Sequence, residues 1–191
     1  PMREVTGVLE ELCRQGKIRH YGVSNYGVEH LRALRQLGRY EVSQPPYSLL
    51  DTASEKDLPF CEAENIGVMV YSPLHKGLLT GKYQGTETFT DFRQHHPDFQ
   101  GERFRLIAEA VQSLKPMADG YGMSIYQLVL TATLMHPAIQ VAVVGIKTAP
   151  QIAEAAAVMG RRLEREDYFQ IRKVLSLGAA GKVKDATGKA K

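Results

Sequence analysis

The sequence predicts a parallel α/β fold, and three observations support this prediction. Amphipathic segments with helical periodicity alternate with short apolar segments along the chain. Each short apolar segment ends in polar or turn-forming residues and is followed by another helical pattern, which is the order of βα units. The run IGVMVY at residues 66–71 is apolar throughout, as expected for a parallel strand that is covered on both faces.

The first two strands each follow a helix. Apolar side chains recur at three- and four-residue spacing over residues 4–15 and 28–38, and a glycine follows or ends each pattern, as is common at the carboxyl end of a helix. Apolar runs over residues 18–23 and 40–44 predict the two strands. The Pro45-Pro46 pair ends the second strand, because proline cannot donate a hydrogen bond to a ladder.

A third helix precedes the apolar strand. We expect Ser54 to cap this helix, which extends to Asn65, because serine accepts hydrogen bonds from the first turn. After the strand, residues 77–101 are rich in Gly, Thr, Gln, His and Pro and predict a long loop. Connections in compact domains are usually short, so this loop is a functional candidate.

The C-terminal part adds one more strand and several helices. Apolar periodicity predicts helices over residues 102–119, 124–135, 149–159 and 164–177, and an apolar run predicts a strand over 140–144. Four parallel strands are half of a (β/α)8 barrel, which needs at least about 200 to 250 residues. An open doubly wound sheet is the alternative. Its usual GxGxxG turn after the first strand is missing here.

The composition and the cysteine content exclude several classes of protein. The 191 residues are 43% hydrophobic and 24% charged, which is typical of a globular chain and excludes a disordered or fibrous one. No run approaches the roughly 18 to 20 apolar residues of a membrane span, and residues 1–5 lack the apolar core of a secretory signal. We therefore expect a cytoplasmic protein with no membrane partner, in which Cys13 and Cys61 are reduced thiols.

Positive charge is concentrated at the carboxyl end. The lysines there are Lys182, Lys184, Lys189 and Lys191. Removing these four from 24 basic residues, and Asp185 from 21 acidic residues, leaves 20 of each sign in residues 1–177. A folded part without basic excess argues against nucleic-acid binding. We interpret residues 178–191 as a flexible tail. A weak polybasic membrane anchor is the alternative.

Four sequence strings have a family-specific form. They are GKIRHYGVSNY at residues 16–26, SQPPYSLLD at 43–51, YSPLHKGLLTGKY at 71–83 and VAVVGIKTAPQIAEA at 141–155. In this order and spacing they resemble the aldo-keto reductase family, especially its bacterial and potassium-channel β-subunit-like branches. The resemblance covers residues 1–177 and implies a (β/α)8 barrel of the TIM type. This chain would hold its last four βα units, a half-barrel, plus C-terminal helices.

The resemblance also implies that NADP(H) lies in extended form across the carboxyl ends of the strands. Ser24, Asn25 and Gln44 take the positions that hold the nicotinamide carboxamide, a group whose donor and acceptor suit amide and hydroxyl side chains. Tyr71 takes the position that stacks on the nicotinamide ring, a contact worth about 0.5 to 1.5 kcal/mol beyond burial. Fixing the carboxamide would decide which face of the ring delivers hydride.

The other implied contacts are with the phosphates and the adenosine. Ser72, Pro73, Leu74 and Gly77 match the pyrophosphate segment, Lys82 and Arg93 match phosphate-clamping cations, and Gly145, Lys147, Thr148, Gln151 and Glu154 match the adenosine end. Lys147 is the candidate partner of the 2′-phosphate that distinguishes NADP from NAD. Lys147 and Thr148 also precede a predicted helix, whose N-terminal N–H groups favour phosphate.

Some residues depart from the family pattern or stand outside it. Ala155 occupies a position where the family often has an asparagine that contacts adenine, so we expect one hydrogen bond fewer, about 0.5 to 1.5 kcal/mol. His75 and Lys76 replace small residues and are expected to add positive charge beside the pyrophosphate. His95 and His96 lack spaced carboxylate or thiol partners, and we interpret them as solvated loop residues and not as metal ligands.

The family reaction depends on an Asp, Tyr, Lys and His tetrad, and no residue of this sequence matches a tetrad position. We therefore expect the cofactor-binding part of an NADP(H)-dependent oxidoreductase that reduces small aldehydes or ketones, inactive as this chain alone. One alternative is a non-catalytic nucleotide-binding or regulatory module that self-associates through exposed sheet edges. Another is an inert remnant without a ligand.

Overall fold

A four-stranded parallel sheet forms the centre of the computed structural model, which describes residues 2–181. The strands are β1 (Gly22–Ser24), β2 (Val42–Gln44), β3 (Gly67–Tyr71) and β4 (Val141–Val143). They lie in the order β1-β2-β3-β4, and each neighbouring pair is parallel. The parallel α/β fold that the sequence predicts is therefore confirmed.

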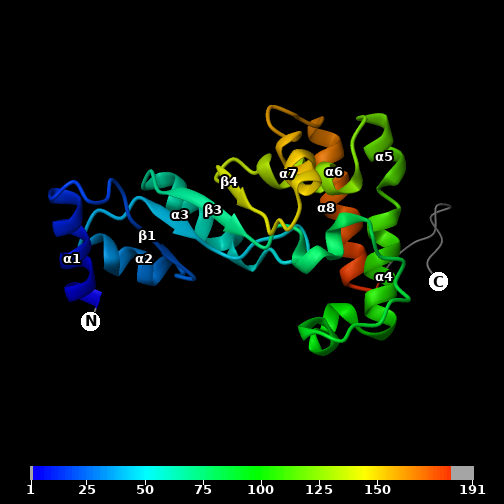
Figure 1. Ribbon diagram of the computed structural model, residues 1–191, viewed down its shortest axis with the longest axis horizontal. Helices are drawn as coiled ribbons and strands as arrows, with labels where there is room; N and C mark the ends of the chain where they lie inside the picture. The colour runs from blue at the N-terminus through cyan, green and yellow to red at the C-terminus, as the bar shows by residue number, and fades with distance from the viewer. Residues whose placement is uncertain (1, 182–191) are drawn as a thin grey trace.

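Helices connect the strands and continue beyond the last one. The α-helices are α1 (Met2–Arg14), α2 (Val28–Arg35), α3 (Leu58–Ala63), α4 (Gly101–Gln112), α5 (Lys115–Gly120), α6 (Ile125–Leu134), α7 (Ala149–Ala156) and α8 (Arg165–Ala179). The 3-10 helices are η1 (Ala53–Asp57), η2 (His75–Thr80), η3 (Phe92–His95) and η4 (Pro97–Phe99). Figure 1 shows α1 and α2 at one end of the molecule, α4 to α8 at the other, and the sheet between them. Over residues 2–181, none of the helices combines the length and apolar character needed to cross a bilayer.

The two faces of the sheet differ in burial. Ser43, Val68 and Val70 lie on one face and are buried. On the other face, Val141 and Val143 of β4 are 40% and 38% exposed, and alternate residues of β3 are only partly buried. The apolar run of β3 predicts coverage on both faces, and this prediction is wrong for the described residues, because they leave the second face partly open to solvent.

The first strand is shorter than its apolar run predicts. β1 pairs with β2 only from Gly22↔Val42 to Ser24↔Gln44, because β2 itself begins at Val42 and is followed by Pro45. At Gly22 a Cβ atom would lie 2.3 Å from the carbonyl oxygen of Val42. Glycine therefore permits the close approach of the two backbones at this point.

The predicted cap at Ser54 is wrong. Ser54 lies inside η1, and its hydroxyl donates to the carbonyl of Pro46 at 2.8 Å. Asp57 follows, and its carboxylate accepts the N–H of Val28 at 2.9 Å. Because Val28 is the first residue of α2, Asp57 satisfies a free N–H group of a different helix, which sequence spacing could not indicate.

The long segment after β3 is largely ordered by aromatic packing. It contains most of η2 and all of η3 and η4, where the sequence predicts a loop. Tyr83, Phe89, Phe99 and Phe104 pack on one another, with neighbouring ring centroids 5.2 to 6.1 Å apart. These aromatic contacts hold the segment against α4, and the segment therefore forms a wall of fixed shape beside the carboxyl end of β3.

Helix α8 continues beyond its predicted end at residue 177. Gly178 is buried inside it against α4, where a Cβ atom would lie 2.5 Å from the Cβ of Ala110. The glycine that suggests a flexible tail is therefore a packing residue. Residues 182–191, to which most of the predicted tail belongs, lie outside the described part of the chain.

Candidate functional site

Polar side chains meet where three neighbouring strands end. The carboxyl ends of parallel strands share one edge of the sheet, and Ser24, Asn25, Gln44 and Tyr71 all lie there. The Ser24 hydroxyl donates to the Gln44 carbonyl at 2.8 Å, and the backbone N–H of Asn25 donates to the same carbonyl at 3.3 Å. The Tyr71 hydroxyl donates to Oδ1 of Asn25 at 2.9 Å. The structure therefore brings together the four residues expected at the nicotinamide.

The backbone is strained at the same edge. Asn25 has φ 63° and Ser72, directly after β3, has φ 59°. His75 and Lys76 follow with φ 46° and 57°. Residues other than glycine rarely adopt this left-handed region, and such strain is concentrated at functional sites. This supports placing a site at the ends of β1 and β3.

A groove of about 660 Å³ continues from the end of β3 to the start of α7. Its lining residues are Ser72, Pro73, Leu74, Lys76, Gly77, Thr80, Lys82, Asp91, Phe92, Arg93, Tyr126, Val143, Val144, Gly145, Lys147, Gln151 and Glu154. This set includes every residue expected at the phosphates and the adenosine except Thr148, the N-cap residue of α7. Segments from four different parts of the chain thus form one continuous surface.

The cations of the groove are not equivalent. Arg93 donates to both carboxylate oxygens of Asp91, at 2.9 and 2.6 Å, and also to the Tyr83 hydroxyl. These hydrogen bonds hold the pKa of Asp91 at about 2, so that Asp91 is ionised at neutral pH. Lys82 and Lys147 form no salt bridge within the described residues. Lys82 and Lys147 are therefore less tightly paired than Arg93: Nζ of Lys82 lies 4.8 Å from the centre of the Tyr83 ring, and Lys147 acts on Asp91 only through its charge.

Two glycines of the groove have different local requirements. Gly77 has φ 92°, and a Cβ atom there would lie 3.3 Å from Nζ of Lys82. A side chain at Gly77 would therefore be strained and would crowd the lysine. At Gly145 a Cβ atom would meet nothing within 4 Å, so within this chain its space is open.

The end of the groove at α7 is held by hydrogen bonds at the start of α7 and from α7 to α6. Gln151 accepts the backbone N–H of Lys147 through Oε1 at 2.7 Å, which orders the entry to α7. Glu154 accepts from the hydroxyl of Ser124 at 2.6 Å, and Ser124 and Gln127 form the capping box of α6. Glu154 therefore links α7 to α6 in addition to lining the groove.

Another groove, of about 690 Å³, lies beside the end of β1. Asn25, Pro45, Pro46 and residues at the start of α2 and in η1 line it. Asn25 is the only residue expected in the nicotinamide site that it includes. Sequence reasoning did not indicate this groove, because its walls come from separate segments without a shared motif.

The side chains of His75 and His96 lie elsewhere than the sequence predicts. The His75 side chain does not face the groove: it is buried, with Nε2 2.7 Å from Oδ2 of Asp98 and Nδ1 3.2 Å from the Ser48 hydroxyl. His96 is partly buried and lies in the same cluster as His75 and Asp98, with ligand-type atoms within 4.8 Å of one another. Sequence reasoning missed this cluster, because His75 and His96 are separated by 20 residues of a segment with no regular spacing.

Comparisons of the sequence with known proteins identify its family. A family model described as "Aldo/keto reductase family" matches residues 1–176. The chain is 34% identical over 179 residues to the aldo-keto reductase YhdN of Bacillus subtilis strain 168. It is 32% identical over 176 residues to the NADH-specific methylglyoxal reductase of Escherichia coli K12. These alignments cover 92% and 91% of this chain and 54% of each relative, so the chain spans about half the length of the curated relatives it matches.

The three-dimensional comparison extends over nearly the whole chain. The structure is similar to that of the glycerol dehydrogenase AKR11B4 from Gluconobacter oxydans, with a TM-score of 0.89 and 29% sequence identity. This similarity covers 97% of this chain and 57% of that chain. Motifs, strand order and backbone arrangement therefore agree, and the chain belongs to the aldo-keto reductase family.

Proposed function

We propose that this chain forms the NADP(H)-binding part of an oxidoreductase that reduces small aldehydes or ketones by hydride transfer. The observation that supports this most strongly is the continuity of the site. Ser72, which directly follows the polar cluster at the end of β3, lines the groove that ends at α7, and the change from amide and hydroxyl groups to cations along this path matches the changing chemistry of a dinucleotide.

The donor set of the groove fits such a ligand. Lys82 and Lys147, which form no salt bridge within residues 2–181, offer their charges to phosphate oxygens, and the first turn of α7 offers N–H groups. Asn25 and Ser24 orient the carboxamide, and the Tyr71 hydroxyl fixes the Asn25 side chain. The Tyr71 ring provides a flat surface for the nicotinamide. When bound, the reduced nicotinamide supplies the hydride.

We propose further that residues 1–191 have no carbonyl reductase activity on their own. No residue among them matches the proton-donating tetrad of the family, and a hydride transfer without a proton donor leaves an unstabilised alkoxide. We expect no oxidation of NADPH by this chain with a small aldehyde or ketone, measured at 340 nm. Activity restored by adding polypeptide that carries the tetrad would support the proposal, and turnover by the 191 residues alone would contradict it.

We assign the preference for NADP(H) over NAD(H) to Lys147. One relative is named as NADH-specific, so the family alone does not decide this choice. Lys147→Gln removes the charge that we assign to the 2′-phosphate. We expect Lys147→Gln to weaken NADPH binding about 10- to 100-fold, because the loss of a charge-assisted hydrogen bond costs about 1.5 to 3 kcal/mol. NADH binding should not change. Fluorescence titration measures both.

The control for Lys147→Gln is Lys17→Gln, which removes an exposed lysine before β1, outside the groove. Lys17→Gln should leave the binding of both cofactors unchanged. An equal loss of NADPH and NADH binding in Lys147→Gln would reject the 2′-phosphate assignment. Saturable binding of NADH in preference to NADPH by the unmodified chain would reject NADP(H) as the cofactor.

A second candidate is a nucleotide-binding module that self-associates. The partly open sheet face supports this candidate, because Val141 and Val143 are exposed there and, among residues 2–181, β1 and β4 each pair on one side only. Burial of such a face stabilises a dimer.

We expect the chain, 21.3 kDa as a monomer, to form a discrete dimer by light scattering. Val141→Lys should dissociate it, and Ile152→Lys on α7, at a side chain 56% exposed, should not. A monomer at all concentrations would contradict this candidate.

A further inference from the structure

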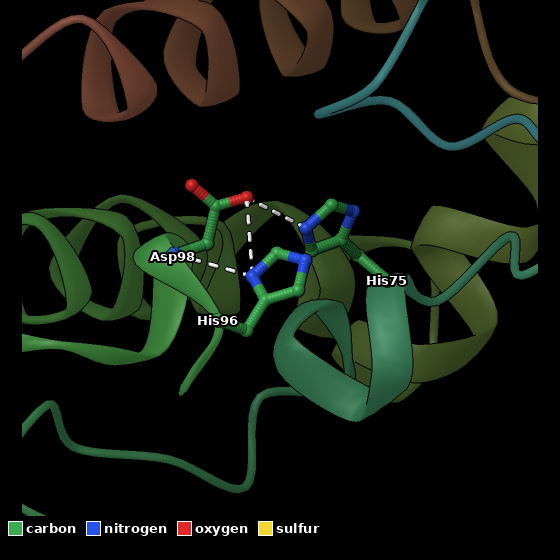
Figure 2. Close-up of side chains that lie close together, drawn as sticks. All are labelled: His75, His96 and Asp98. Atoms are coloured by element: carbon green, nitrogen blue, oxygen red, sulfur yellow. Dashed lines mark hydrogen bonds and ion pairs between the residues drawn. The ribbon is translucent and has the colours of Figure 1, made fainter. Parts of the chain in front are cut away.

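His75, His96 and Asp98 form a compact cluster beside the groove (Figure 2). His75 lies in η2, Asp98 lies in η4, and His96 immediately precedes η4. Each offers one metal-ligand atom, and the three atoms lie within 4.8 Å of one another. In Figure 2 both imidazole rings lie next to the Asp98 carboxylate, and Nδ1 of His96 also accepts the backbone N–H of Asp98 at 3.3 Å, a hydrogen bond that a metal would replace.

The spacing of these atoms suits one small cation. His75 Nε2 lies 2.7 Å and His96 Nδ1 lies 4.0 Å from Oδ2 of Asp98. Tetrahedral zinc with bonds of about 2.0 to 2.1 Å holds its ligand atoms roughly 3.4 Å apart. The observed distances lie on both sides of that value. Side-chain rotations that open the first distance and close the second are therefore required when a metal binds.

Further hydrogen bonds hold the cluster in place, as outer-shell groups do in metal sites. The Ser48 hydroxyl lies 3.2 Å from His75 Nδ1, the nitrogen that faces away from Asp98. Arg103 donates through Nε to Oδ1 of Asp98 at 2.5 Å, which leaves Oδ2 for the histidines. The side chains of His75, Asp98 and His96 are only 9%, 14% and 25% exposed. The cluster is thus oriented and largely shielded from water.

We propose that His75, His96 and Asp98 bind a divalent transition metal, with Zn²⁺ as the best match. Two imidazoles and one carboxylate are a ligand set for zinc and its neighbours, whereas Mg²⁺ and Ca²⁺ prefer oxygen alone. Three protein ligands leave a fourth position, which faces a cavity of about 360 Å³. A water molecule or a small anion would complete the coordination there.

Lys76 is the competing cation at this site. Its Nζ lies 3.2 Å from Nε2 of His96, and its side chain is exposed and free to turn away when the metal binds. Lys76 and Ser72 line both this cavity and the larger groove. A metal would therefore tie the segment after β3 to the segment around η4, and would fix one wall of the groove without contacting the proposed cofactor.

Co²⁺ titration of the metal-depleted chain tests the proposal without any cofactor. A tetrahedral Co²⁺ site absorbs in the visible range, and Zn²⁺ should displace Co²⁺ at one equivalent per chain. His96→Gln and Asp98→Asn each remove one ligand, and we expect each to weaken binding by about 100-fold or more, beyond the 10- to 100-fold effect of outer-shell changes. His95→Gln is the matched control. It changes the adjacent exposed histidine, which is not part of the cluster, and should bind as the unmodified chain does.

Lys76→Gln should tighten Zn²⁺ binding, because it removes a like charge beside His96. Circular dichroism of each metal-free variant shows whether it is folded. If a ligand variant does not fold, Lys76→Gln, a substitution at the surface, still tests the proposal. No stoichiometric Co²⁺ or Zn²⁺ binding by the unmodified chain would overturn the proposal. Equal affinity of His96→Gln and His95→Gln, or weaker binding by Lys76→Gln, would also overturn it. None of these outcomes depends on the proposed NADP(H) site.

Discussion

Gly178→Ala should lower the free energy of unfolding by about 2 kcal/mol, within the 1 to 3 kcal/mol typical of overpacking. An added Cβ atom would lie 2.5 Å from the Cβ of Ala110 and 3.3 Å from the carbonyl oxygen of Leu106, so α4 and α8 must separate. In an open helical position the same change stabilises a helix by about 0.5 to 1 kcal/mol. The steric effect is larger, so we expect the melting temperature to fall by about 4 to 8 °C.

Gly7→Ala is the matched control for this prediction. Gly7 lies within α1, and a Cβ atom there would meet nothing within 4 Å, so the change should stabilise the chain. Adding Ala110→Gly to Gly178→Ala removes the opposing methyl group and should recover part of the loss, measured by thermal or urea unfolding. If Gly178→Ala and Gly7→Ala both raised stability, α8 would not pack on α4 as the structure describes.

Arg172→Met should cost about 2 kcal/mol of stability. Arg172 on α8 donates to both carboxylate oxygens of Glu55 in η1, at 2.6 and 3.0 Å, and the Tyr47 hydroxyl donates to the same carboxylate at 2.7 Å. Both charged side chains are 27% exposed. The cost should therefore lie between the 0 to 1 kcal/mol of a surface pair and the 3 to 5 kcal/mol of breaking a buried one.

The dependence of stability on pH provides a second measure of this pair. Burial alone would raise the pKa of Glu55, but the hydrogen bonds from Arg172 and Tyr47, with the charge of Arg172, together outweigh burial and lower the pKa below its ordinary value of 4.5. A carboxyl whose pKa is lower in the folded state stabilises the fold above its unfolded pKa, and this stability is lost as the pH falls through the folded pKa. Below pH 4.5, the free energy of unfolding should therefore decrease less steeply with falling pH in Arg172→Met than in the unmodified chain.

Arg105→Met on α4 is the matched control for Arg172→Met. Arg105 also pairs with two carboxylates, those of Glu102 and Glu109, but its side chain is 43% exposed. It should cost less than about 1 kcal/mol. Equal losses for the two arginine variants, measured by urea unfolding at neutral pH, would show that the Glu55–Arg172 pair contributes no more than a surface pair.

Much of the fold could be predicted from the sequence because its signals are local. Helical periodicity placed α1 and α6 to within two residues, and Ser124 forms the capping box of α6 within a single turn. The YSPLHKGLLTGKY string could be matched to the family because its residues are contiguous. The groove follows, since parallel strands bring their carboxyl ends to one edge of the sheet.

The predictions that failed depend on partners distant in sequence. Asp57 supports α2 and not its own helix, and His75 turns away from the groove toward Asp98 because Ser48 and Asp98 satisfy both ring nitrogens. The exposed face of β3 depends on what else packs against the sheet, which an apolar run cannot reveal.

The sequence by itself determined the family, the order of the βα units and the residue types of the proposed dinucleotide site, because periodicity and motif spacing are properties of neighbouring residues. Only the tertiary structure decided which groove cations are less tightly paired, since Arg93 pairs with Asp91 while Lys82 and Lys147 form no salt bridge in the described chain. It alone joined His75 to His96 and Asp98. Such contacts form when the chain packs, and their energy depends on distances and burial that no local pattern encodes.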